Sequence, residues 1–205
     1  TLTTATSESH EIRLQNQERI AGMIDYVVGY LHYKSSSNTD FQQVISQIGS
    51  APALAGVIRL PLNRYGDEKE ESLFANVTLH VNDAIELSGG ARQIWYNTLS
   101  GLKSYAVSTG TFVDNAALLR QAKRKATIYS ASAKYRVTED VMVYANFGTS
   151  WRPDTVAIGG PALPSALQVA FLGTPPEKSK SYEVGFKSDF LDRMLRVNVS
   201  AYLQK

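Results

Sequence analysis

The sequence contains no cysteine among its 205 residues, and it has no long apolar run. Without cysteine, the chain can form neither disulfides nor thiolate metal sites. No apolar stretch approaches the roughly 18 residues that indicate a transmembrane helix. The mean hydropathy is −0.19, so the overall composition does not indicate a membrane protein. A soluble β-protein and a transmembrane β-barrel both remain open, because only half of each barrel strand faces lipid.

Patterns typical of catalytic or metal sites are also missing. The histidines at 10, 32 and 80 are far apart and lack the paired spacing of a metal site. No Ser/His/Asp set stands out, and the glycine pairs at 89–90 and 159–160 lack the context of a phosphate loop. We therefore expect no cofactor and no metal centre.

Charge gives little guidance about partners. The formal net charge is +2, and the basic residues are accompanied by neither interleaved aromatics nor a recognition helix. We expect no nucleic-acid partner. No signal peptide opens the chain, which starts at Thr1 within a Ser/Thr-rich stretch. Either a leader was removed or the sequence is a fragment, and we favour a fragment.

The most informative stretch runs from Pro176 to Leu203 and predicts two long β-strands joined by a tight turn at 191–193. Apolar and polar residues alternate in both strands, which predicts one apolar and one polar face. One face should carry Val184, Phe186, Val197 and Val199, and the other Glu183, Lys187, Arg196 and Asn198. Strands of about ten residues exceed the usual five or six. They have the length that a tilted strand needs to cross a bilayer.

The same alternation of apolar and polar residues, interrupted by turns, recurs along the chain and predicts about eight strands. They cover roughly residues 8–15, 20–33, 71–81, 84–96, 126–137 and 141–151, followed by the two strands of the hairpin at 176–203. Short turns are expected near residues 17, 82, 139 and 192, and long segments at roughly 34–70, 97–124 and 152–178. Short turns on one side and long loops on the other are typical of an outer-membrane barrel. Weak signals predict some helix at 51–60 and a helical turn or two at 115–125.

Three segments resemble one family. PEKSKSYEVGFKSDFLDRMLRVNVSAY at 176–202 resembles the late barrel region of TonB-dependent outer-membrane receptors. YRVTEDVMVYANFGTSWRPD at 135–154 is similar to that family's hairpin ending in a Phe/Trp-Arg-Pro element. EIRLQNQERIAGMIDYVVGYLHYK at 11–34 resembles its Glu-Ile/Leu-Arg-Leu strand and the partner that follows. The three matches occur in the family's order and touch most of the predicted strands.

The resemblance implies an all-β fold: an antiparallel transmembrane β-barrel segment with short periplasmic turns and long extracellular loops. Residues 1–205 would form a partial barrel domain, its middle-to-late part, in the outer membrane of a Gram-negative bacterium. The family implies an importer and not an enzyme. It would take up a scarce ligand, such as a ferric siderophore, in an energised process, with TonB engaged through a plug region absent from this sequence. One alternative is a complete eight-stranded barrel acting as an anchor or adhesion module. Another is an outer-membrane barrel enzyme, for which the sequence nominates no catalytic set.

Two groups of residues are candidate sites. The densest basic cluster comprises Lys123, Arg124 and Lys125. It ends a predicted outer loop, so it would lie at the outer-leaflet surface and contact lipopolysaccharide phosphates; its alternative is a solvated loop end. Ligand contact is expected at the tops of two strands, from Arg92, Tyr96, Trp151 and Arg152. The alternative there is that luminal arginines pair with luminal carboxylates.

Overall fold

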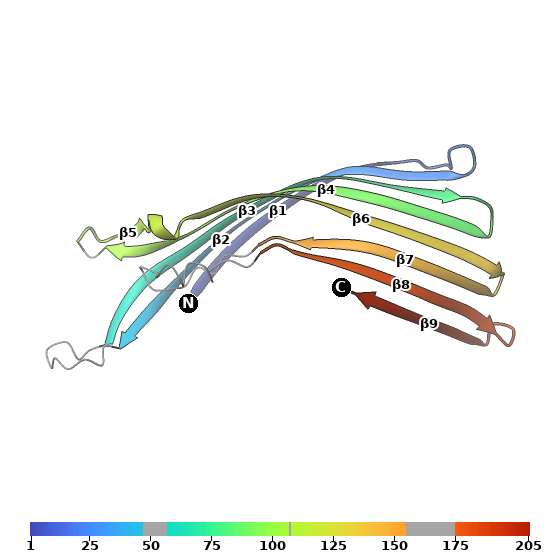
Figure 1. Ribbon diagram of the computed structural model, residues 1–205. Helices are drawn as coiled ribbons and strands as arrows, with labels where there is room; N and C mark the ends of the chain where they lie inside the picture. The colour runs from blue at the N-terminus through green and yellow to red at the C-terminus, as the bar shows by residue number, and fades with distance from the viewer. Residues whose placement is uncertain (47–56, 107, 155–174) are drawn as a thin grey trace.

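The chain forms one curved antiparallel sheet (Figure 1). The computed structural model describes residues 1–46, 57–106, 108–154 and 175–205. Its elements are β1 (Leu2–Gln15), β2 (Ile24–Ser46), β3 (Val57–His80), β4 (Ile85–Ala106), β5 (Thr111–Asp114), the 3₁₀ turn η2 (Ala116–Leu118), β6 (Arg120–Thr138), β7 (Val141–Arg152), β8 (Glu177–Phe190) and β9 (Leu195–Gln204). None of the helical structure in these ranges is long and apolar enough to span a membrane.

Strands that follow one another in sequence also lie side by side, in the order β1-β2-β3-β4-β6-β7-β8-β9, and the short β5 pairs with β4. The sheet is open: within the described residues no ladder joins β1 to β9. β1 and β9 are therefore the two edges of the sheet. A closed eight-stranded barrel would require the missing ladder.

Four short connections lie at one end of the sheet, on the right in Figure 1. We call this the turn end and the opposite end the loop end. At the β3–β4 turn, Asn82 Oδ1 accepts hydrogen bonds from the backbone N–H groups of Ala84 at 2.9 Å and Ile85 at 2.8 Å. Asn favours this geometry because its side chain can mimic a backbone turn. The β8–β9 turn lies at residues 191–194, where the sequence predicted it.

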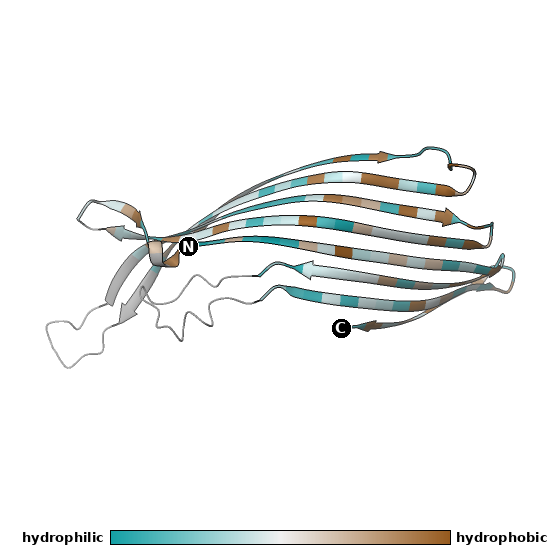
Figure 2. Ribbon diagram, turned by 45° about the horizontal axis from the view of Figure 1, so that its top comes forward, coloured by the Kyte–Doolittle hydropathy of each residue, from teal (hydrophilic) through white to brown (hydrophobic). Residues whose placement is uncertain are grey.

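Hydrophobic and hydrophilic residues alternate along the strands (Figure 2). Because successive side chains of a strand point to opposite faces, the two faces of the sheet differ in chemistry. The register pairs Val184 with Ala201 and Phe186 with Val199 on one face, and Glu183 with Tyr202 and Lys187 with Asn198 on the other. The predicted division of this hairpin is therefore confirmed.

The apolar face runs across the whole sheet at the turn end and has no protein layer over it. Its side chains remain largely exposed, for example Ile12 at 75%, Leu73 at 53%, Val184 at 59% and Val199 at 60%. A soluble monomer rarely leaves so wide an apolar surface uncovered. An apolar face of this width is what the lipid-facing side of a transmembrane barrel presents.

Two direct cross-strand pairs on the polar face place an aromatic ring over a glycine. Phe74 covers Gly29, and Tyr144 covers Gly185. A Cβ at either glycine would occupy the position of the ring. Glycine is thus required by a close approach, and the aromatic ring compensates for the side chain that the glycine lacks.

Several strands extend further toward the loop end than the sequence predicted. β2 has 23 residues, β3 has 24 and β4 has 22, so much of the segments predicted as loops at 34–70 and 97–124 is strand. Apolar alternation stops where the apolar face stops, but backbone pairing continues between polar residues. The helix predicted at 51–60 lies partly outside the described residues, and residues 57–60 belong to β3. The helical signal at 115–125 corresponds to η2, after which β6 begins at Arg120.

Candidate functional site

A cavity of about 640 Å³ lies on the polar face near the loop end. Strands β2, β3, β4 and β6 and the end of β7 contribute to it. Its lining includes Tyr33, Glu68, Glu70, Tyr96, Arg124, Arg152 and Asp154. These residues point to one side because they occupy alternate positions of long, regularly paired strands.

Tyr96 of β4 is the most enclosed of the predicted ligand residues, with 8% of its surface exposed. Its ring meets the ring of Trp151 edge-on, with 6.0 Å between centroids. Tyr96 lies beyond the apolar band, and burial raises the pKa of its phenol above the ordinary 10.0, with a further contribution from the carboxylate of Glu68. The phenol therefore stays neutral at physiological pH and can donate a hydrogen bond.

Arg124 of β6 forms a two-pronged ion pair with Asp154. Its Nε and Nη2 donate to the two carboxylate oxygens at 2.9 Å and 2.6 Å. Asp154 has only 11% of its side chain exposed. This bidentate geometry is among the stronger side-chain pairings. It holds the chain just after β7 against β6.

Arg92 lies on β4 four residues before Tyr96, nearer the turn end than the cavity. Its Nη2 donates to Glu70 at 2.7 Å, and its Nε donates to Ser72 Oγ at 3.0 Å. Ser72 is fully buried. Arg152 pairs with Glu177 at 3.5 Å, but both side chains are about two-thirds exposed. That pair contributes little, because water screens exposed charges.

The cavity is balanced in charge. The carboxylates of Glu68, Glu70 and Asp154 face the guanidinium groups of Arg120, Arg124 and Arg152. Tyrosine hydroxyls add neutral donors and acceptors. Such a lining can hold a polar ligand that presents both kinds of group, and an anionic ligand would compete with a carboxylate for each arginine.

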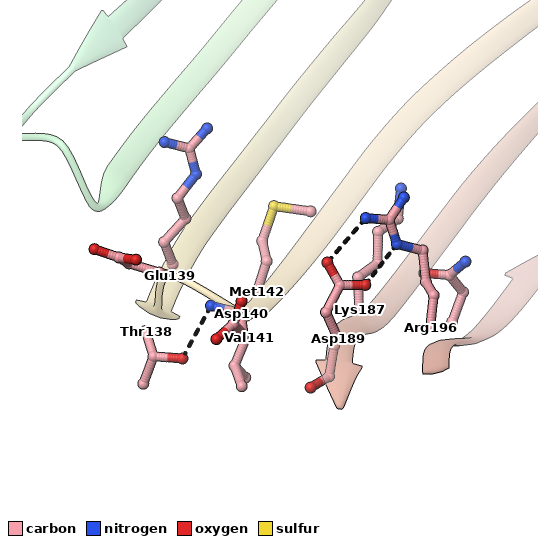
Figure 3. A pocket seen from close by; sticks show the side chains of 11 residues that line it. Thr138, Glu139, Asp140, Val141, Met142, Lys187, Asp189 and Arg196 are labelled. Atoms are coloured by element: carbon pink, nitrogen blue, oxygen red, sulfur yellow. Dashed lines mark hydrogen bonds and ion pairs between the residues drawn. The ribbon is translucent and has the colours of Figure 1, made fainter. Parts of the chain in front are cut away.

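A second polar cavity, of about 290 Å³, lies at the turn end between the β6–β7 and β8–β9 hairpins (Figure 3). Arg196 donates from Nε and Nη2 to Asp189 at 2.6 Å and 2.8 Å. These two residues are direct cross-strand partners. The ion pair joins β8 and β9 close to their turn.

The structure brings three of the four predicted ligand residues together. Tyr96 and Arg152 line the loop-end cavity, and Trp151 contacts Tyr96. Arg92 reaches the cavity only through Glu70, and this arginine–carboxylate pairing is the structural alternative that the sequence had left open.

The basic cluster at 123–125 is divided between the two faces. Arg124 is on the polar face with Asp154, whereas Lys123 and Lys125 point the other way. Glu70, Asp154 and Tyr33 were missed. Strand alternation continued past the apolar part of β3 would have placed Glu70 on the polar face, but not beside Arg92, since that pairing depends on the register between strands.

Comparison with known proteins decides the family. A model of the TonB-dependent receptor-like β-barrel matches residues 2–205. The chain belongs to the TonB-dependent receptor β-barrel family. Its alternating polar and apolar faces thus correspond to the lumen and the lipid side of such a barrel. No curated protein gives a significant match.

Several solved receptors share the fold of this TonB-dependent receptor barrel chain. The ferric yersiniabactin uptake receptor FyuA from Yersinia pestis aligns with a TM-score of 0.72 and 17% identity, covering 98% of this chain and 28% of that one. The ferric-catecholate import receptor Fiu from E. coli K12 gives 0.71 and 18%, covering 98% and 31%. The siderophore receptor PiuA from Acinetobacter baumannii gives 0.63 and 16%, covering 98% and 32%. The chain therefore spans about a third or less of these receptors.

Proposed function

We propose that this chain is part of an outer-membrane receptor that takes up a scarce ligand, most simply a ferric siderophore, with energy supplied through TonB. The observation that carries the proposal is the family match over residues 2–205. The two-faced sheet supports it, because a receptor barrel needs lipid on one side and a polar lumen on the other. The names of the similar solved receptors, which concern ferric yersiniabactin, ferric catecholate and siderophore import, favour the ligand class.

The proposal includes a location and partners. The receptor resides in the outer membrane of a Gram-negative bacterium, where the apolar face meets lipid and lipopolysaccharide. The turn end faces the periplasm and the loop end faces outward. TonB engages a plug region of the full-length protein. The receptor is not an enzyme, and nucleic acid is not a partner.

Within this function the loop-end cavity is a ligand contact in the upper lumen. Tyr96 offers a flat, enclosed ring and a neutral hydroxyl, and Arg152 offers an exposed cation at the rim. Arg124 forms an ion pair with Asp154, and an anionic group of the ligand would compete with that carboxylate for the guanidinium. These features suit a chelate that carries ring surfaces and oxygen ligands.

The test is uptake by cells. Deleting the gene in its host should abolish accumulation of radiolabelled iron from at least one member of a panel of ferric siderophores, and the full-length gene should restore it. A strain lacking TonB should show the same defect. Unchanged uptake of every chelate in the deletion strain, under iron limitation, would contradict the siderophore proposal.

A further inference from the structure

A further cavity on the polar face, of about 340 Å³, lies nearer the turn end than the loop-end cavity. We call it the mid-lumen cavity, and strands β1, β3, β4, β6 and β7 contribute to it. Arg92 lines the mid-lumen cavity, whereas its partner Glu70 lines the loop-end cavity. The ion pair of 2.7 Å between these two side chains therefore stands between the two cavities.

The floor of the mid-lumen cavity is a row of small residues. Gly90 of β4, Ser130 of β6 and Gly148 of β7 are consecutive cross-strand partners. Aromatic rings cover Gly29 and Gly185 on the same face of the sheet, but a Cβ at Gly148 would meet no atom of the described residues within 4 Å. The hollow above Gly148 is therefore left open by the fold, and a larger side chain there would extend into the cavity.

The mid-lumen cavity carries an excess of positive charge. Among the described residues, its charged lining consists of Arg13 and Arg92 against the one carboxylate of Glu11. Arg13 pairs with Glu11 and lies 5.9 Å from the centre of the Phe74 ring, with 62% of its side chain exposed. The loop-end cavity, in contrast, has equal numbers of cations and carboxylates. An anion that moves from the loop-end cavity toward the turn end therefore meets a more positive lining.

We propose that the mid-lumen cavity is a second ligand site, which an anionic ferric chelate occupies after it leaves the loop-end cavity. The inference rests on the proposed uptake function. Arg92 exchanges Glu70 for an anionic oxygen of the chelate, and Arg13 adds a second cation. Tyr96 and Gly90 are six residues apart on β4, which is about 20 Å along the strand. The two cavities are thus separate sites, and the Arg92–Glu70 pair connects them.

Two positions separate this site from the loop-end cavity. Gly148→Leu fills the hollow, and Gly148→Ala is a smaller step in the same direction. The matched control is Ser181→Leu, because Ser181 is the direct cross-strand partner of Gly148 on β8 and lies outside the cavity lining. Arg13→Gln removes the excess charge, and Arg13→Lys keeps it.

The experiment uses cells that express the full-length receptor, and the radiolabelled ferric chelate whose uptake the gene deletion abolishes. Binding at the cell surface is measured in a strain that lacks TonB, so that transport does not follow. The uptake rate is measured in a strain that has TonB. Heat-dependent gel migration reports the amount of folded receptor in each variant.

Gly148→Leu should lower the maximal uptake rate on the order of tenfold, while surface binding stays within about twofold of the parent. Gly148→Ala should lie between the two. Arg13→Gln should lower the uptake rate on the order of tenfold, which corresponds to the loss of one hydrogen bond to a charged group. Arg13→Lys should restore most of that rate, and Ser181→Leu should leave uptake and binding unchanged.

Unchanged uptake by a folded Gly148→Leu receptor would overturn the inference, as would an equal loss in Ser181→Leu. Equal losses of surface binding and uptake would assign the effect to the loop-end cavity and also refute it. Sensitivity of Gly148→Leu cells to a large antibiotic that the outer membrane excludes would show that the plug region fills the hollow instead. An unchanged rate in Arg13→Gln would refute the anionic ligand class. In each case the parent receptor still takes up the chelate, so the proposed function stands and only this inference fails.

Discussion

A single arginine placed on each face of the sheet tests the membrane assignment. Val184 of β8 pairs with Ala145 and Ala201 on the apolar face and is 59% exposed in the sheet itself. It is six residues from Phe190, where β8 ends. Six residues cover about 20 Å along the strand and roughly 15 Å along the normal at a tilt of about 40°. That depth is close to the middle of an apolar band about 25 Å tall.

Val184→Arg should therefore lower the free energy of unfolding of the membrane-inserted receptor by about 2–4 kcal/mol, the cost of arginine near the bilayer midplane. This corresponds to a factor of roughly 30 to 900 in the folding equilibrium. The control is Ser132→Arg, which lies on the polar face one row away, opposite Asn146. It should cost less than about 1 kcal/mol, because a luminal arginine stays hydrated.

The assay is equilibrium denaturation of the full-length receptor folded into phospholipid vesicles, followed by tryptophan fluorescence and by heat-dependent gel migration. Both variants are compared with the parent at the same lipid-to-protein ratio. Equal losses in the two variants, or a larger loss for Ser132→Arg, would refute the assignment of faces. A position-independent effect would mean that the apolar face is not in lipid.

Three further substitutions follow from specific contacts. Gly185→Val should displace the ring of Tyr144 and break its 2.8 Å hydrogen bond to Glu183. The free energy of unfolding, measured by denaturation, should fall by about 1–2 kcal/mol. Adding Tyr144→Ala to the same chain should restore most of that stability. Asp154→Asn should free the Arg124 guanidinium and tighten binding of an anionic siderophore several-fold in calorimetry, with a neutral siderophore unaffected; equal effects on both would count against the competition argument. Tyr96→Ala should weaken ligand binding at least tenfold without unfolding the barrel, and Tyr96→Phe should retain most of the ring contribution.

The sequence allowed the part of the fold in contact with lipid to be predicted well. The alternation in β8 and β9 gave their faces, and the polar residues Asn82 and Asp83 gave a turn. In each case the chain has to satisfy two environments at once, water or a polar lumen on one side and lipid on the other. That requirement leaves a period of two in the sequence.

Beyond the apolar band both faces of a strand meet water, so the sequence no longer alternates between apolar and polar residues. The segment 35–40 of β2 is serine, asparagine, threonine and aspartate, yet it pairs residue by residue with β3. Nothing in its composition distinguishes a strand in water from a polar loop, because both faces are wet. The strands continue because backbone hydrogen bonds between neighbours are still made. A pattern based on hydrophobicity therefore could not predict where the strands end on the loop side of the sheet.

The candidate site shows the same limit at the level of single residues. The sequence nominated Tyr96, Trp151 and Arg152 because aromatic and basic residues are conspicuous near the ends of predicted strands, and the structure places the three close together. Glu70 was missed because the carboxylate that neutralises Arg92 comes from a neighbouring strand, and register between strands is not visible in one sequence.

The basic run at 123–125 shows that adjacency in a strand is not adjacency on a surface. In a strand, neighbouring side chains point to opposite faces, so three consecutive cations cannot act as one patch. Arg124 belongs to the lumen, where its bond to Asp154 secures the chain after β7. Lys123 and Lys125 lie on the other face, where Lys123 shares its cross-strand row with Lys69 of β3. The strand therefore presents an ion-paired arginine on one face and two exposed lysines on the other.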